Sequence, residues 1–358
     1  MIGRVRLVVA RAAAVAALCV ATGWALSGCA ANTAGAAVPA PASVVRLGYF
    51  DDVTHAPALV GVREGIIRAA LGATALTTEQ FNAGPAEIEA LNAGAIDAAY
   101  VGPSPAINAY VASGGASLRI VAGATEGGAA LVVRSGIDRT SQLAGATLAT
   151  PQLGNTQDVA LRAFLTSHGL RTSLTTGGDV TIEPESNALT LAQFEQGTID
   201  GAWVPEPWVT RLVHAGGHVL VDESTQWPRG TYPTTVLVVS QRFLAEHPAT
   251  VRALVAADVR SVDWLTAHTA AEDARVVGAQ MAADGAKSLP AAVLQEALRN
   301  VTFSPDPIAS AYSTELAHAT AAGIGRGGSI RGIVDVSQLD AVLRGAHRSP
   351  ITVQEALG

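Results

Sequence analysis

The polar side chains best suited to holding a small solute lie in loops that lead into predicted helices. The loop at residues 152–156 reads QLGNT, in which Gly154 lets the backbone approach closely and Asn155 and Thr156 offer donors. A helix start presents unpaired N–H groups and a partial positive charge, both of which favour an anion. The loop therefore predicts contact with a bound anion, although Asn155 or Thr156 could instead simply cap the helix.

Three further polar residues occupy comparable positions. Ser104 lies between two prolines, where it could donate to a ligand or cap its own helix. Thr125 lies in the Gly-rich segment 123–128, which we expect to be a loop, and His55 lies in a strand-to-helix loop. A lone loop histidine is more often solvated or capping than a ligand contact. The candidate loops contain no lysine or arginine, so neutral donors are expected to hold the ligand.

Two tryptophans flank an acidic residue in the segment WVPEPW at residues 203–208. Trp203 and Trp208 could form a wall for the apolar part of a ligand, or they could pack in a strand core and on a helix. A carboxylate that faces an anion is unfavourable, so Glu206 should point away or meet an ammonium group on the ligand. Taurine, which carries an amine and a sulfonate, would satisfy the second alternative.

These loops belong to an internal repeat. Residues 89–115 are echoed at residues 192–217, and each copy predicts the end of a helix, a Gly turn, a short strand, a Pro-bearing loop and a second helix. Such a loop lies at the carboxyl end of a sheet, where open α/β folds bind ligands. The repeat predicts two similar lobes with the ligand between them. Asp97 and Asp200 occupy equivalent turn positions, so we expect them to cap turns rather than form a reactive pair.

The order of predicted elements is the same in both halves. The strands are expected at residues 44–50, 77–81, 98–101, 147–150, 180–183, 201–204 and 234–240, with helices between them and at 247–266, 270–283 and 290–300. The expected fold is α/β, with two lobes that the chain joins near residues 130–136 and 231–237. Two such crossings form a hinge that permits closure around a ligand.

The first 28 residues resemble an export signal. Arg4, Arg6 and Arg11 precede an apolar run at residues 12–26, which is short for a membrane span. The run ends in LSGC, which resembles a lipobox, so Cys29 is the expected site of lipidation; an ordinary signal peptide or a membrane anchor is the alternative. Residues 29–43 are expected to form a flexible tether. The resulting protein would be exported and lipid-anchored to the outer face of the cytoplasmic membrane.

Composition excludes several classes of function. The chain carries a net charge of −7, and the three signal arginines account for +3, which leaves −10. The sequence has no basic patch, so nucleic acid is not an expected partner. Cys19 leaves with the signal and Cys29 would be lipidated, which excludes disulfides, Cys metal sites and Cys nucleophiles in the processed chain. No cofactor and no metal is expected.

The combination resembles a known family. The segments GYFDDVTHAPALVGVREG, FNAGPAEIEALNAGAIDAAYVGPSPAINA, GATLATPQLGNTQDVALRAFL and IDGAWVPEPW are similar to periplasmic substrate-binding proteins of ABC importers, in the nitrate, taurine and aliphatic sulfonate group related to the NMT1/THI5-like fold. The resemblance covers roughly residues 44–345. It implies a type II periplasmic-binding-protein fold divided into lobe 1 (44–132), lobe 2 (133–232) and a return to lobe 1 with C-terminal helices (233–358).

The resemblance also implies a function. The expected ligand is a small anionic solute, with an aliphatic sulfonate or taurine leading, which the protein would deliver to a permease and, through it, to an ATPase. Nitrate, bicarbonate and the pyrimidine precursor of thiamine are the alternatives, and a sensory receptor subunit could use the same cleft. An enzyme of the THI5-like class depends on a Cys-rich motif that the processed chain lacks, so catalysis is not expected.

Overall fold

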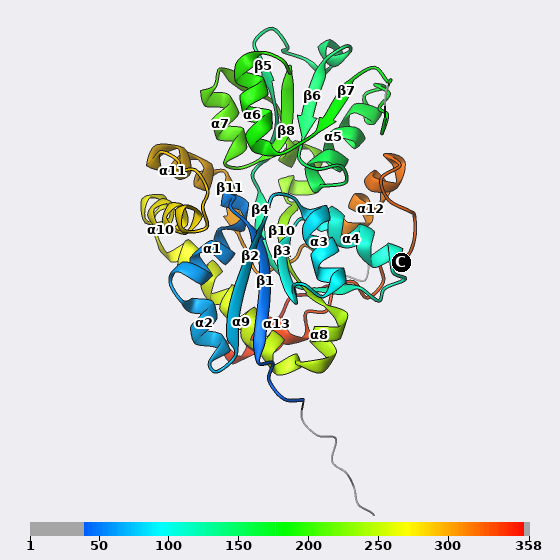
Figure 1. Cartoon of the computed structure of the whole chain (residues 1–358). Helices are drawn as coiled ribbons and strands as arrows, with labels where there is room; N and C mark the ends of the chain where they lie inside the picture. Colours follow the sequence, from blue (N-terminus) through cyan, green and yellow to red (C-terminus); the bar gives the residue numbers. More distant parts are fainter. Residues whose placement is uncertain (1–38, 176, 354–358) are drawn as a thin grey trace, which may run out of the picture. The chain divides into compact units, whose positions relative to one another are not determined.

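The computed structural model describes residues 39–175 and 177–353 (Figure 1). The predicted signal segment, Cys29 and the first part of the tether lie outside the described residues. Across the described ranges, no helix is both long enough and apolar enough to cross a membrane.

Two sheets carry the fold, and their strands are arranged alike. In the first sheet β1 pairs in parallel with β2 and β3, and β10 pairs antiparallel with both β3 and β4. In the second sheet β6 pairs in parallel with β7 and β8, and β5 pairs antiparallel with both β8 and β9. The strand bounds in spatial order are β11 Val301–Phe303, β4 Leu118–Gly127, β10 Pro233–Ser240, β3 Ala98–Val101, β1 Val44–Phe50 and β2 Ala75–Phe81, and then β7 Thr181–Pro184, β6 Thr147–Thr150, β8 Gly201–Pro205, β5 Ala129–Arg134 and β9 Gly217–Asp222.

Helices connect the parallel strands and cover both sheets. Their bounds are α1 Ala56–Arg63, α2 Ile66–Leu71, α3 Gly84–Ala93, α4 Pro103–Ala112, α5 Thr156–Ser167, α6 Asn187–Gln196, α7 Trp208–His214, α8 Gln241–Glu246, α9 Pro248–Ala267, α10 Ala270–Ala283, α11 Ala291–Arg299, α12 Tyr312–Ala321 and α13 Ser337–Gly345. The sequence predicts one helix over residues 58–71, but the left-handed backbone of Gly65, with φ 69°, separates α1 from α2.

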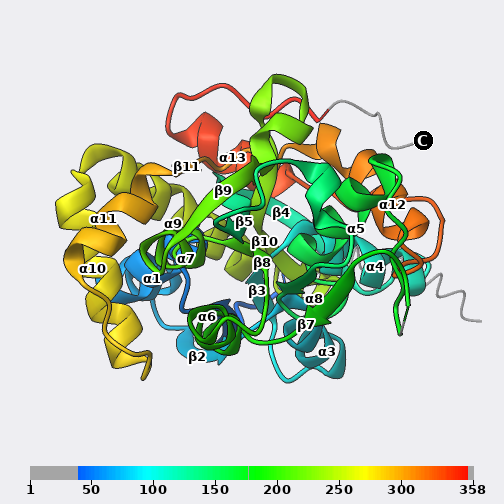
Figure 2. The ribbon, with the colours of Figure 1, turned by 90° about the horizontal axis from the view of Figure 1, so that it is seen from above.

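The central strands β3, β4 and β10 of the first sheet each contribute to two cores because both faces of the sheet are covered there. In β3, Ala98 and Tyr100 face one core with α1, α9 and α10, whereas Ala99 and Val101 face another with α3 and α4. Figure 2 shows these two groups of helices on opposite sides of the strands. A strand buried on both faces needs a continuous apolar run, which β3 and the middle of β10 show in the sequence, whereas the edge strand β2 is largely exposed.

The repeated aspartates lock neighbouring strands together. Asp97 accepts hydrogen bonds from the Arg46 backbone N–H (3.0 Å) and from the Arg46 guanidinium (2.6 and 2.9 Å). Asp200 accepts from the Thr147 backbone N–H (2.8 Å) and pairs with Arg134 (3.2 Å). Each carboxylate therefore joins the start of one strand to its parallel neighbour, which is a tertiary contact rather than the predicted turn cap.

The strand β4 is longer than the sequence predicts. It continues through Gly127, so Thr125 lies in a strand and not in the expected Gly-rich loop. The glycine at position 123 has a packing role, because a Cβ there would collide with the backbone of Asp306, which runs alongside. Glycine in a strand interior often marks such a close approach, and its presence made the segment look like a loop.

Two described segments differ from the predicted boundaries. The chain changes sheet at Gly128, between β4 and β5, which is earlier than the predicted crossing at residues 130–136. The last residues of the predicted tether are held in place, because the Ala42 N–H donates to Thr250 Oγ1 (2.9 Å) and the Ala42 carbonyl accepts from Thr74 Oγ1 (2.7 Å). The division into lobes by residue number remains a prediction.

Replacing Asp97 with alanine should destabilise the protein by about 2 kcal/mol, because it leaves a part-buried guanidinium and a backbone N–H without their acceptor. Asp200→Ala should cost about 1 kcal/mol, since its carboxylate is more exposed. Urea unfolding followed by circular dichroism measures both, with the exposed Glu89→Ala as control. An Asp97→Ala midpoint equal to that of the control would contradict the strand-locking role.

Candidate interlobe ligand site

The parallel strands of both sheets end at one cleft. The residues that follow β1, β2 and β3 in the first sheet, and β6, β7 and β8 in the second, line a common space. The inner part of this cleft is lined by Phe50, Asp52, Thr54, His55, Asn82, Gly102, Asn155, Thr156, Gln157, Asn187, Pro205 and Thr234. This is the edge at which open α/β sheets bind ligands.

In the inner part the two lobes touch. Asn155 Oδ1 accepts from the Gly84 backbone N–H (3.1 Å), and Gln152 Oε1 accepts from the Ala86 backbone N–H (3.2 Å). Gly102 lies so close to Thr156 that a Cβ at position 102 would collide with the Thr156 hydroxyl. The space left is about 10 Å³, which is room for about one water.

Neutral donors and helix starts dominate the inner part. The helices α1, α3, α4, α5 and α6 all begin at this space, so their first-turn N–H groups and positive dipole ends converge there. The Thr156 hydroxyl is buried and has no hydrogen-bond partner among the described residues. The predicted convergence of helix starts is therefore present, and α6 joins it in addition to the helices that the sequence indicated.

His55 is one of these neutral donors. Its Nδ1 accepts from the Phe50 backbone N–H (3.2 Å), and its ring stacks on the Phe50 ring with centroids 4.1 Å apart. Burial lowers the pKa of His55 to about 3, so the imidazole is neutral at pH 7. Because Nδ1 accepts, the proton lies on Nε2, which makes that nitrogen a donor.

The outer part of the cleft is larger, at about 460 Å³. It shares Phe50, Asp52, Asn82 and Asn187 with the inner part and extends to α7 and to the end of α10. A volume of this size suits a small organic molecule.

Trp208 spans the outer part between the lobes. Its Nε1 donates to Asp52 Oδ1 (2.7 Å), and the Arg211 guanidinium lies over its ring, 4.1 Å from the centroid. Burial raises the pKa of Asp52 to about 7, although the hydrogen bond from Trp208 and the charge of Arg211 act in the opposite direction. Trp208, which the sequence singled out, thus lies at the cleft.

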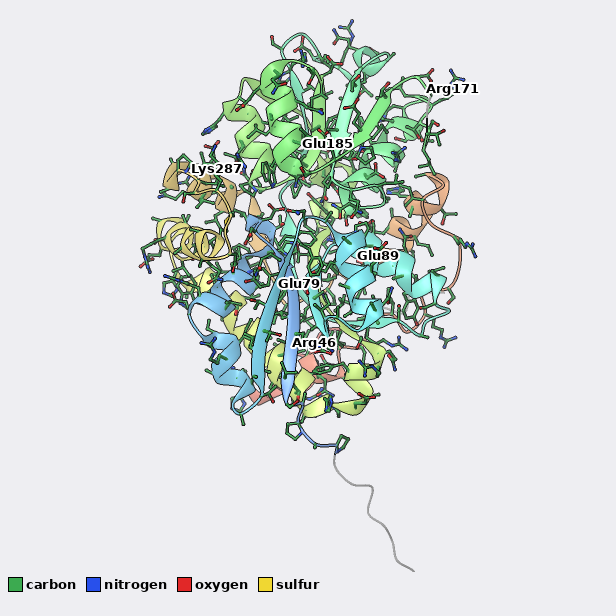
Figure 3. All side chains as sticks on the ribbon, in the orientation of Figure 1. Arg46, Glu79, Glu89, Arg171, Glu185 and Lys287 are labelled. Carbon is green, nitrogen blue, oxygen red and sulfur yellow. The ribbon has the colours of Figure 1, made fainter. Side chains whose placement is uncertain are left out.

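Several charged residues of the outer part were missed by the sequence reasoning: Asp51, Asp52, Arg211, Asp284 and Lys287. Arg211 follows Trp208 by three residues on α7, a spacing that places both side chains on one helix face, so a local signal for it existed. Lys287, which is labelled in Figure 3, and Asp284 come from the segment that begins at the end of α10. No local pattern connects that segment with the cleft.

Three predicted residues do not line the cleft. Ser104 donates its hydroxyl hydrogen to Glu315 Oε2 (2.5 Å), a carboxyl whose pKa burial raises to about 8. The Gly154 N–H donates to Asp158 Oδ2 (3.0 Å), and its left-handed backbone, with φ 81°, closes the turn before α5. Thr125 is buried within β4.

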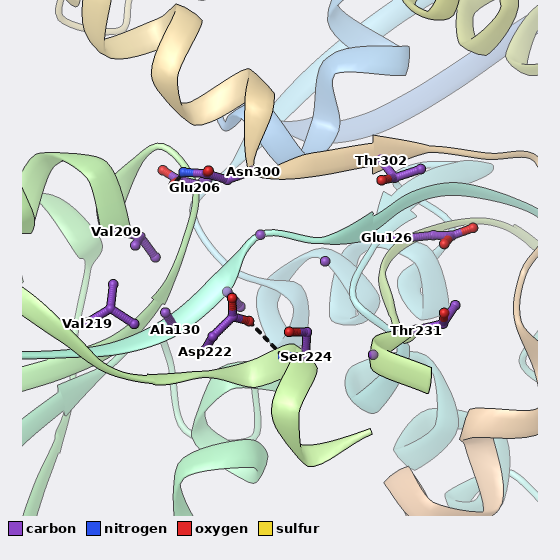
Figure 4. A pocket seen from close by; sticks show the side chains of 14 residues that line it. Glu126, Ala130, Glu206, Val209, Val219, Asp222, Ser224, Thr231, Asn300 and Thr302 are labelled. Atoms are coloured by element: carbon purple, nitrogen blue, oxygen red, sulfur yellow. Dashed lines mark hydrogen bonds between the residues drawn. The ribbon is translucent and has the colours of Figure 1, made fainter. Parts of the chain in front are cut away.

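Trp203 and Glu206 lie at separate cavities. Trp203 is fully buried against Phe164, and its Nε1 donates to Glu223 Oε2 (2.7 Å). Glu206 accepts from the Thr210 N–H (3.1 Å), the Thr210 hydroxyl (2.9 Å) and Asn300 Nδ2 (2.6 Å). Figure 4 shows Glu206 beside Asn300 at a cavity of about 370 Å³, near the point where β4 passes into β5. Its carboxylate is thus supplied with donors away from the cleft.

Comparison with known proteins places this geometry in a family. The NMT1-like family model matches residues 38–279, about two thirds of the chain. The chain belongs to the NMT1-like family. A protein of Brucella abortus (strain 2308), named as a predicted binding protein, is 24% identical over 193 residues, which is 53% of this chain and 57% of that protein. The chain thus spans little more than half the length of the curated relatives it matches.

Solved structures share the fold of this NMT1-like chain. The alkanesulfonate-binding protein SsuA from Xanthomonas axonopodis pv. citri, bound to MOPS, aligns with a TM-score of 0.67 at 21% identity, covering 80% of this chain and 96% of that one. The periplasmic nitrate-binding protein NrtA from Synechocystis PCC 6803 aligns with a TM-score of 0.71 at 14% identity, covering 85% and 89%. These similarities confirm the predicted bilobal periplasmic-binding-protein fold.

The buried neutral His55 should make stability depend on pH. Its folded pKa, about 3, lies below its unfolded value of about 6.5, so its contribution is complete above pH 6.5 and is lost as the pH falls towards 3. Relative to His55→Gln, the wild type should lose about 2 kcal/mol of unfolding free energy between pH 7 and pH 4.5. Urea unfolding at both pH values measures the difference, and parallel pH profiles for the two proteins would contradict the assignment.

Proposed function

We propose that this protein is the extracytoplasmic solute-binding component of an ABC importer and that it carries out no catalysis. The solute would be held in the interlobe cleft and delivered to a permease with its ATPase. The observation that carries the proposal is the convergence of helix starts from both sheets on one cleft. The chain passes between the two sheets at two points, from β4 to β5 and from β9 to β10. Two crossings permit the lobes to open and close around a solute.

The proposed solute is a small molecule with an anionic group, and an aliphatic sulfonate or taurine is the leading candidate. Helix starts, His55 Nε2 and the Thr156 hydroxyl supply neutral donors at the inner part. Arg211 adds a half-buried cation at the outer part. Phe50 and Trp208 line the same space and suit an alkyl segment.

The alternatives fit the cleft less well. Nitrate and bicarbonate are small relative to the outer volume of about 460 Å³ and would leave its apolar wall unused. A pyrimidine ring would need a face of Trp208 for stacking, and Arg211 covers one of its two faces. Both remain in the ligand screen because the helix starts and neutral donors of the inner part would suit a small anion once the lobes open.

Asn155 has a different proposed role from Thr156. Both ends of the Asn155 amide are engaged, since Oδ1 accepts from the Gly84 N–H and Nδ2 donates to Gln157 Oε1 (2.9 Å). Asn155 therefore holds the lobes together, whereas His55 and Thr156 have donors to offer. Trp203, Glu206, Ser104 and Gly154 would act on the ligand only through the residues they position.

A screen by thermal shift tests the ligand class. A sulfonate at a hundredfold over its Kd should add about 2.7 kcal/mol of stability, a clear rise in Tm. The panel contains alkanesulfonates, taurine, nitrate, bicarbonate and formylaminopyrimidine. Thr156→Val should reduce the shift for the best ligand, whereas the exposed control Thr225→Val should not. The absence of a shift with every sulfonate would overturn the leading assignment.

We also propose that the protein is exported and held on the outer face of the cytoplasmic membrane by a lipid on Cys29. The lipobox-like LSGC segment supports this, and it precedes the described residues. Cys29→Ser should move the protein from the membrane pellet to the soluble fraction after cell fractionation, because it removes the acylated thiol. Equal membrane association of the variant and the wild type would refute lipid anchoring through this residue.

A further inference from the structure

The outer part of the cleft has carboxylates as well as a cation on its walls. Asp51 lies at the end of β1, and Asp284 lies at the end of α10, and both line the cavity of about 460 Å³. Burial and, next, the adjacent Asp284 carboxyl together raise the pKa of Asp51 to about 7. Two carboxyls this close need a shared proton or a cation between them.

Hydrogen-bond acceptors in this cavity lack donors. Asp51 Oδ1 has no hydrogen-bond partner among the described residues. Asn187 gives a second, independent observation: the residue is only 7% exposed, it lines both parts of the cleft, and its Oδ1 has no partner within the described ranges. Buried acceptors of this kind are costly unless something supplies an N–H or O–H.

An anion-binding group lines the same cavity. The Arg211 guanidinium is half-buried over Trp208 and forms no ion pair with any described residue. Lys287 is exposed at the rim and likewise pairs with no described carboxylate. The cavity therefore contains two acceptor oxygens without donors, and a guanidinium on which the charge of Asp52 acts but which forms no ion pair among the described residues.

We propose that the cleft selects a zwitterion, with an ammonium group held by Asp51, Asp284 and Asn187 Oδ1 and an anionic group held by Arg211. This inference rests on the proposed solute-binding function and adds a positive charge to the anionic solute proposed there. A primary ammonium has three N–H donors and no acceptor. It would supply the donors that Asp51 Oδ1 and Asn187 Oδ1 lack, and it would add to the donors that the Asp284 carboxylate already has from Tyr49 and Gln280. Glu206, the carboxylate that the sequence suggested for an amine, is engaged by Thr210 and Asn300 and takes no part.

The ionisable groups around Asp51 determine how binding should vary with pH. They are Asp284, whose Oδ2 accepts from the Tyr49 hydroxyl (2.9 Å), Asp52 beside Trp208, and the cations Arg211 and Lys287. The proton on Asp51 must leave when an ammonium binds, so affinity for the zwitterion should rise from pH 5.5 to pH 8. A ligand without an amine should lack this rise.

Calorimetric titration of the purified protein with taurine and isethionate tests the proposal, because the two sulfonates differ only by an ammonium in place of a hydroxyl. Taurine should bind at least tenfold more tightly at pH 8. Asp51→Asn should weaken taurine binding at least tenfold, remove its pH dependence and change isethionate affinity by less than twofold. Asp284→Asn repeats the test at the second carboxyl, in case Asp51→Asn fails to fold. The exposed Glu79→Gln on β2 is the matched control.

The outcomes separate the two proposals. Equal affinity for taurine and isethionate, or an equal loss of both in Asp51→Asn, would overturn the zwitterion inference and leave the sulfonate-binding function standing. Arg211→Gln should weaken both sulfonates at least tenfold. β-Alanine covers a zwitterion with a carboxylate: if it binds with the same Asp51 dependence while no sulfonate binds, the zwitterion stands and the sulfonate assignment fails. Binding of neither zwitterion overturns the inference.

Discussion

Helix starts at the carboxyl edges of two sheets leave backbone N–H groups that their own helices cannot satisfy, and the rest of the structure depends on how these donors are used. Side chains from the opposite lobe satisfy some of them, as Asn155 does for Gly84 and Gln152 does for Ala86. The starts of α1, α4, α5 and α6 also lie at the cleft. Lobe contact and anion binding use N–H groups from the same helix starts. A solute that enters the inner part must therefore either replace the side chains that hold the lobes together or bind the N–H groups that those side chains leave free.

Much of the fold could be predicted from the sequence because its signals are local. Apolar runs marked the strands buried on both faces, and the repeated Gly–Ile–Asp turns marked the two copies, with Gly94 and Gly197 in the left-handed conformation at the ends of α3 and α6. The errors have physical causes. Gly123 signalled a loop but serves the approach of Asp306, and the composition of residues 39–43 signalled a tether although Ala42 is pinned by Thr250.

The site was less predictable because its charges come from distant segments. Helix-start loops identified His55, Asn155 and Thr156 at the inner part, but whether a carboxylate faces the cleft depends on donors far away in sequence. Glu206 is engaged by Asn300, 94 residues later, and Ser104 is turned to Glu315, 211 residues later. Asp51 and Asp284 lie at the same cavity although they are far apart in the sequence, and no sequence motif contains both. Sequence spacing therefore located the cleft but could not assign the direction of its acidic side chains.

The anchoring of Ala42 defines a mechanical frame for the molecule. Residues 40–42 are fixed to α9 and to the turn before β2 through His247, Thr250 and Thr74. Any pull on the chain ahead of residue 40 is therefore transmitted to the first sheet and not to the second. In that frame the first sheet is the stationary part. The second sheet, which the chain joins to it near Gly128 and Thr231, is the part that would move when the cleft closes on a solute.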